Sequence, residues 1–194
     1  MEEIRIVPRI DVLEIHEAGP IHQMRLAFAP GMNILTDRGG GGTGKTTILN
    51  CVAAAATACW PAEHQPSVRS QTKVTAEYGG NIYMFEPNQR AVAAAPPSPG
   101  HSRSSLAAGP RALGSLRREL MSAPPHSLVL MDGDILGVMD LCRLRRAIQL
   151  LAASAAQKLV VVAESLVGCF SGFACCLCTL EVSNEMAQCV CADF

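Results

Sequence analysis

A glycine-rich run between residues 39 and 47 has the residue types and spacing that most directly indicate chemistry. It begins with four glycines and continues Thr-Gly-Lys-Thr-Thr, which matches a phosphate-binding loop. In such a loop, glycines let successive backbone N–H groups face phosphate oxygens, and the N-terminus of the next helix adds a positive dipole end. The lysine neutralises the β and γ phosphates, and the next threonine offers its hydroxyl to Mg²⁺. The residues predicted to bind ATP with Mg²⁺ are Gly39, Gly42, Thr43, Gly44, Lys45, Thr46 and Thr47.

A carboxylate is also expected at this site, because a Mg²⁺ ion held by one hydroxyl needs a further oxygen ligand from the protein. Asp132 is the candidate, since it directly follows the apolar run Leu128–Met131. We therefore predict Thr46 and Asp132 as the metal ligands. The alternative is that Asp132 only ends a strand at a turn.

The elements around the loop support a phosphate site over a glycine-rich turn without function. The apolar segment 32–36 predicts a buried strand that leads into the loop, and the alanine-rich segment 45–58 predicts a helix after it. Upstream, apolar residues at every second position predict antiparallel strands. These are Ile4 and Ile6, then Ile10 and Val12, then Met24, Leu26 and Phe28.

The rest of the chain alternates between further predicted strands and helices. We expect a hairpin over 71–85, a flexible Pro/Ala/Ser loop over 87–110, a helix over 111–121, strands over 127–131 and 158–163, and a closing hairpin over 176–192. A helix between the two strands is predicted from the apolar stripe Leu141, Leu144, Ile148, Leu151 and Ala155. The fold predicted for residues 1–194 is a single α/β P-loop NTPase domain with a mostly parallel central sheet, an N-terminal antiparallel flank and a C-terminal β-hairpin.

Composition limits the classes of protein that this chain can be. Its 194 residues are 49% apolar and 17% charged, which excludes intrinsic disorder. A net charge of −1 gives no overall support for DNA binding, and a solvated helix face explains the run Arg143–Arg146. The uncharged stretch 165–180 is too short for a spanning helix, so no membrane span is expected.

Nine cysteines are many for this length, but the odd number in a chain of this size favours a reduced, cytoplasmic protein. Six of them follow residue 168. A thiolate metal site is one interpretation. We prefer buried strand cysteines, because Cys176 and Cys178 alternate along one predicted strand, and Cys189 and Cys191 along its partner.

With these motifs the sequence resembles the ATP-binding-cassette class of P-loop ATPases, nearest to its RecF- and SMC-like AAA branch. The segment 28–50 resembles that branch's opening strands and Walker A motif. The segment 106–116 stands where the family has its signature motif, and Asp140 resembles the D-loop aspartate. The resemblance implies ATP-dependent dimerisation with a second copy or a related ATPase subunit, which moves an effector protein that no motif identifies.

The same comparison shows departures at the residues for hydrolysis. Gly133 follows Asp132 where the family has a water-polarising glutamate, and Asp134 comes next. Glu164 stands where a histidine is usual. The resemblance makes Asp134 and Glu164 candidate substitute catalytic bases, and places the glutamine-loop residue at Gln89 or Glu86.

Loss of the orienting base costs on the order of 10²- to 10⁴-fold in rate, so we expect ATP·Mg binding with slow or partner-dependent hydrolysis. A regulatory subunit that binds nucleotide without turnover is the main alternative. A ParA-like protein and a small-molecule kinase are two further P-loop alternatives, although the chain lacks a second lysine at Gly40 and an arginine-rich lid.

Overall fold

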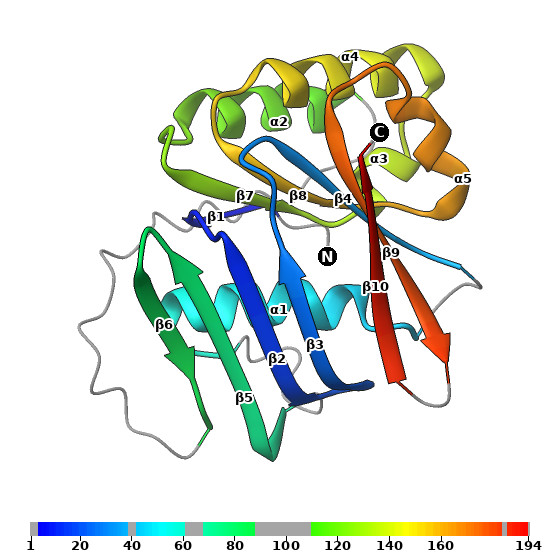
Figure 1. The fold of residues 1–194 in the computed structure, drawn as a ribbon. Coiled ribbons are helices and arrows are strands. Elements are labelled where there is room, and N and C mark those ends of the chain that lie inside the picture. The colour runs from blue at the N-terminus through cyan, green and yellow to red at the C-terminus, as the bar shows by residue number, and fades with distance from the viewer. Residues whose placement is uncertain (1–3, 39–41, 61–67, 88–109, 184–185, 194) are drawn as a thin grey trace.

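Two β-sheets enclose helix α1 (Lys45–Thr57), and further helices cover the far side of the larger sheet (Figure 1). The structure is a computed structural model that describes residues 4–38, 42–60, 68–87, 110–183 and 186–193. The expected flexible loop over 87–110 lies almost wholly outside the described residues.

The larger sheet has six strands in the order β1-β7-β8-β4-β9-β10. The four central strands run parallel, and the edge strands β1 and β10 are antiparallel to their neighbours. β4, β7 and β8 are buried along their whole length, as expected of parallel strands covered on both faces. The predicted mostly parallel sheet and C-terminal hairpin are confirmed. The strands are β1 (Ile4–Pro8), β4 (Met32–Asp37), β7 (Ser127–Met131), β8 (Gln157–Val161), β9 (Cys175–Ser183) and β10 (Met186–Asp193).

The smaller sheet is antiparallel, with the order β3-β2-β5-β6. It combines the N-terminal strands with the hairpin expected over 71–85, whose turn is Gly79-Gly80. Leu13, Ile15 and Ala18 are buried in β2, whereas Val12 is half-buried, so the face expected at the start of this strand was wrong by one residue. The strands are β2 (Val12–Ala18), β3 (Ile21–Ala27), β5 (Val68–Tyr78) and β6 (Asn81–Phe85).

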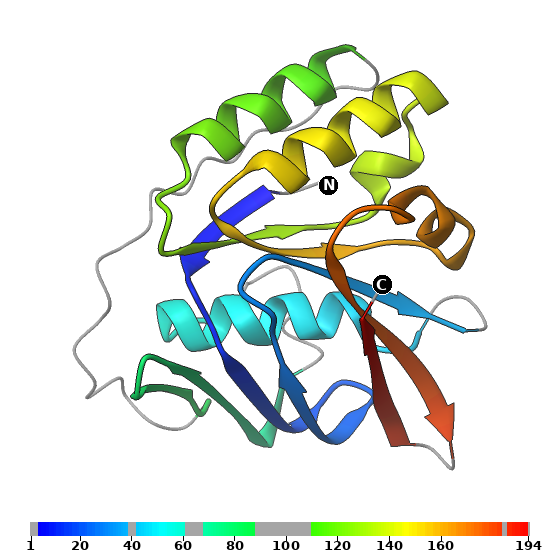
Figure 2. The ribbon, with the colours of Figure 1, turned by 45° about the horizontal axis from the view of Figure 1, so that its top comes forward.

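Helices α2 and α4 lie side by side over the outer face of the larger sheet (Figure 2). The predicted stripe on α4 is correct at Leu144, Ile148 and Leu151, which are buried. It was wrong at its ends, because Leu141 is 73% exposed and Ala155 lies beyond the helix. The helices after α1 are α2 (Pro110–Ser122), α3 (Asp134–Gly137), α4 (Leu141–Ala153), α5 (Glu164–Val167) and the 3-10 helix η2 (Gly168–Phe170).

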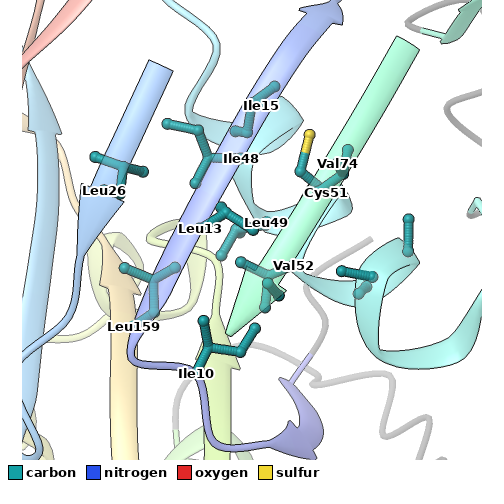
Figure 3. Packing of buried hydrophobic residues seen from close by; sticks show 14 of the residues in the cluster. Ile10, Leu13, Ile15, Leu26, Ile48, Leu49, Cys51, Val52, Val74 and Leu159 are labelled. Atoms are coloured by element: carbon teal, nitrogen blue, oxygen red, sulfur yellow. The ribbon is translucent and has the colours of Figure 1, made fainter. Parts of the chain in front are cut away.

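Helix α1 is buried on nearly every side, because it packs against both sheets. Ile48 and Val52 of this helix lie among residues of β2, β3, β5 and β8 (Figure 3). Cys51 is fully buried in the same cluster, and burial raises the pKa of its thiol. An alanine-rich helix suits this place, since small side chains let two sheets approach it closely.

Candidate functional site

The glycine loop joins the end of β4 to the start of α1, so strand, loop and helix follow in the predicted order. Gly42 and Gly44 have φ angles of +92° and +100°, a left-handed region that favours glycine. Gly44 caps α1, and its carbonyl accepts the first helical hydrogen bond from Ile48 N at 2.9 Å. Backbone N–H groups at this helix start are available to an anion.

The turn between β2 and β3 packs directly against this loop. A Cβ atom on Gly44 would lie 3.1 Å from Cγ1 of Ile21 and 3.2 Å from Cγ of Pro20. The left-handed backbone angle favours glycine at position 44, and a side chain there would also press on Ile21 and Pro20. The smaller sheet thus positions the phosphate loop through its turn, although the two are separated in sequence.

Beneath the loop, one buried carboxylate holds two of the predicted site residues. Asp37, the last residue of β4, is 4% exposed and forms an ion pair with Lys45 Nζ. Thr43 Oγ1 donates a hydrogen bond of 2.7 Å to the same Oδ2 atom. Burial acts to raise the pKa of Asp37, but the hydrogen bonds from Lys45 and Thr43 and the charge of Lys45 hold that pKa below its ordinary value.

Our reading of the sequence missed Asp37. The available signal was an acidic residue at the end of an apolar strand, two positions before the first glycine. An aspartate there is easily taken for a turn residue. Only the return of the chain into α1 brings Lys45 next to its carboxylate.

Thr46 and Thr47 begin α1 but face different surroundings. The predicted metal ligand Thr46 is exposed, whereas Thr47 is only 7% exposed. Thr46 is therefore open to a ligand at the loop, while Thr47 is largely covered by the protein. Gly39 lies outside the described residues.

Asp132 lies at the same edge of the sheet as the phosphate loop. β7, β8 and β4 are parallel, with Met131 beside Val160 and Leu35 beside Val161. The carboxyl ends of these strands therefore meet at one edge, and β8 lies between the half-buried Asp132 and the strand that enters the loop. Thr46 and Asp132 supply the hard oxygen donors that Mg²⁺ prefers, so the residues present fit this ion.

Gly133 packs against the neighbouring strand with no room for a side chain. A Cβ atom at this position would lie 2.1 Å from the carbonyl oxygen of Val161 and 3.0 Å from Cα of Val162. The chain then turns at once into α3, with Leu136 N donating to Gly133 O at 3.0 Å. Any side chain here would point into the end of β8.

Among the candidate substitute bases, Glu164 is placed at this edge by the fold. Glu164 follows the end of β8, which lies between β4 and β7, and it is exposed at the start of α5. Asp134 begins α3, and its side chain lies outside the described part of the chain. Gln89 also lies outside the described residues, while the other glutamine-loop candidate, Glu86, forms an ion pair with Lys73 at 3.2 Å.

Asp140 has a structural role in the described chain, because it caps the N-terminus of α4. Its Oδ1 accepts from Arg143 N at 2.9 Å, and its Oδ2 accepts from Arg143 Nη1 at 2.6 Å. Of the signature-like segment 106–116, the described part forms the first turns of α2. The segments that resemble the family's interface motifs therefore begin helices here.

The described cysteines of the closing hairpin behave as core residues. Cys178 is 1% exposed and Cys176 packs against the same cluster around α1, while Cys175 packs against the cluster on the other face. Within the described residues, no three His, Cys, Asp or Glu side chains gather as a metal site. None of the described helices combines the length and apolar character needed to cross a membrane.

Two solved structures resemble this chain over nearly its whole length. An SMC head bound to the C-winged helix domain of ScpA gives a TM-score of 0.66 at 10% identity, with 96% of this chain and 99% of that chain covered. The SMC head domain from Thermotoga maritima gives a TM-score of 0.55 at 11% identity, with 96% and 100% covered. No family model and no curated protein matches the sequence. The chain has the fold of an SMC head domain, an ATP-binding-cassette-type P-loop ATPase fold, which confirms the predicted fold class.

Proposed function

We propose that this chain is an ATP·Mg-binding head domain that acts through ATP-dependent dimerisation with a second copy or a related ATPase subunit. The observation that carries the proposal is the loop between β4 and α1. There, left-handed glycines lead into a helix start next to Lys45, and Asp132 stands at the same edge of the sheet. The fold supports this assignment over the ParA-like and kinase alternatives, and the cysteine usage supports a cytoplasmic location.

Each part of the loop has a role in binding. Backbone N–H groups at the start of α1 and the ammonium of Lys45 bind phosphate oxygens, while Thr46 and Asp132 hold the metal. Mg²⁺, when bound, supplies charge neutralisation at the phosphates. These groups provide affinity without a catalytic base.

Hydrolysis is slow or depends on a partner, because Gly133 provides no group that can orient water. The expected loss is on the order of 10²- to 10⁴-fold in rate. Of the two substitute bases, Glu164 is the better supported, since it follows the strand between β4 and β7 and is exposed. Asp134 stays a second candidate.

The dimer interface is proposed at the edge that carries the nucleotide. Val138, which follows α3, and Leu141, which begins α4, lie on either side of Asp140 in sequence and are 47% and 73% exposed. Exposed large apolar side chains close together in sequence are consistent with an interaction surface. Closing two heads over the nucleotides would cover them, and an effector would then respond to the closed pair. The SMC head neighbour is bound to the C-winged helix domain of ScpA, which suggests the kind of protein involved.

The second candidate is a regulatory subunit that binds nucleotide and pairs with a catalytically competent homologue. The packing of Gly133 against Val161 favours this regulatory role, because it sterically excludes a catalytic glutamate at position 133. Turnover measured alone and with the partner distinguishes the two candidates.

The test is titration calorimetry with ATP and Mg²⁺, together with size-exclusion mass with and without ATP. Lys45→Ala should abolish binding and the ATP-dependent increase in mass, because it removes the cation at the phosphates. Arg25→Ala is the control for loss of one positive charge, since this exposed arginine lies on β3 and pairs with Glu14. Unchanged ATP affinity in Lys45→Ala would contradict ATP binding at this loop. Vigorous ATP turnover by the isolated protein would contradict slow hydrolysis.

A further inference from the structure

We propose that Asp37 sets the charge selectivity of the phosphate loop, so that the loop accepts magnesium-complexed nucleotide and discriminates against free polyphosphate anions. The inference rests on the proposed function, because it concerns the same loop. Asp37 acts through Lys45 and is a positioning residue.

Asp37 and Lys45 form a largely buried ion pair beside the phosphate loop. The side chain of Asp37 is 5% exposed and that of Lys45 is 19% exposed, so their ion pair is largely withdrawn from water. The same Oδ2 atom accepts from Thr43 Oγ1 at 2.7 Å. One buried oxygen therefore holds a residue of the loop and the lysine that follows it.

Asp37 also determines the net charge that a ligand meets at the loop. Without a ligand, Asp37 neutralises Lys45, so the site lacks the net positive charge that the lysine would otherwise give it. A phosphate that binds must either share the ammonium of Lys45 with Asp37 or break the ion pair between them. In both cases negative charge comes close to a buried carboxylate, where screening by solvent and salt is weak.

The electrostatic repulsion between Asp37 and a bound phosphate grows with the negative charge of the ligand. Free ATP and inorganic tripolyphosphate carry more net negative charge than ATP complexed with Mg²⁺, so Asp37 disfavours them more. A residue that only shaped the loop would affect all of these ligands alike. The graded effect therefore separates an electrostatic role from a structural one.

The experiment is titration calorimetry of the full chain with ATP plus Mg²⁺, with ATP in chelator, and with tripolyphosphate in chelator. Asp37→Asn removes the charge but keeps an oxygen that can accept from Thr43. It should tighten binding of both magnesium-free ligands by about tenfold or more, and binding of ATP·Mg by a smaller factor. Asp37→Glu keeps the charge and should give no gain. Asp11→Asn is the control for net charge, because Asp11 precedes β2, at the end opposite the turn that contacts Gly44.

If the wild type binds ATP·Mg but Asp37→Asn weakens all three ligands, or changes them equally, the role of Asp37 is refuted while the proposed function stands. If neither protein binds any of the ligands, the proposed function fails and the role of Asp37 fails with it. Thermal melting checks that the variant folds. Should Asp37→Asn not fold, Asp37→Ser removes the same charge and carries the same expectation.

Discussion

At the residue scale, Gly133 shows why the hydrolytic glutamate cannot simply be added to this chain. Its missing side chain would point at the carbonyl of Val161, the last residue of β8, and not into open space. The close approach of β7 to β8 at this point leaves no room for a Cβ atom, and the obstacle is backbone, which does not move aside as a flexible side chain would. Packing against β8, as well as the chemistry of hydrolysis, therefore determines which residue can occupy position 133.

Replacing Gly133 should therefore destabilise the protein without gain of activity. Gly133→Ala is expected to cost about 1–3 kcal/mol in the free energy of unfolding, because a methyl group must displace β8. Gly133→Glu should cost at least as much and should not raise phosphate release from ATP. Urea unfolding and a phosphate-release assay measure the two effects.

The matched control is Gly137→Ala, since a Cβ atom at Gly137 meets nothing within 4 Å and its φ is not positive. This variant should keep the stability of the wild type within about 1 kcal/mol. A Gly133→Glu protein that is stable and hydrolyses ATP faster would show that the backbone yields here.

At the scale of elements, β8 joins the two sheets through its first residue. Gln157 is 1% exposed, and its Nε2 donates to Ile10 O at 2.8 Å and to Ala29 O at 2.9 Å. Its Oε1 accepts from Ile10 N at 3.1 Å. Ile10 lies between β1 and β2 and Ala29 between β3 and β4, so one amide side chain holds two of the connections that pass between the sheets.

Gln157→Leu should lower the free energy of unfolding by about 2–3 kcal/mol, because it removes the side-chain partner of the buried N–H and C=O groups of Ile10. The half-buried carbonyl of Ala29 also loses this bond but keeps the one from Asn33. Hydrogen exchange at the amide of Ile10 should become faster in the native state. Gln149→Leu on the exposed side of α4 is the control and should change stability little. Equal stability of the two variants would mean that the crossings are held by other contacts.

At the scale of the whole molecule, α1 makes one cooperative unit of two sheets. Its apolar residues belong to a single cluster with residues of both sheets, including Leu13 of β2 and Leu159 of β8 (Figure 3). The smaller sheet and the inner face of the larger sheet lose their shared core if this helix leaves. The phosphate loop, which begins the same helix, is therefore anchored to the whole fold.

Ile48→Ala should lower the free energy of unfolding by about 2–5 kcal/mol, because Ile48 is fully buried where the sheets meet. Hydrogen-exchange protection at Leu13 and at Leu159 should fall by the same amount, as for a single transition. Leu141→Ala, at a residue that is 73% exposed, is the control with little expected change. Loss of protection in the smaller sheet alone would show that the sheets unfold separately.

The sequence by itself determined the strand, loop and helix that form the phosphate loop, and the positions of most other strands. These features depend on residues close together in the chain, such as the glycines before Lys45 and the apolar run before Asp132. The ion pair of Lys45 with Asp37, the contact of Gly133 with β8, and the separation of β1 from β2 into different sheets were decided by the tertiary structure. Each depends on contacts between segments far apart in sequence or on the direction in which the chain returns, which spacing and periodicity do not encode.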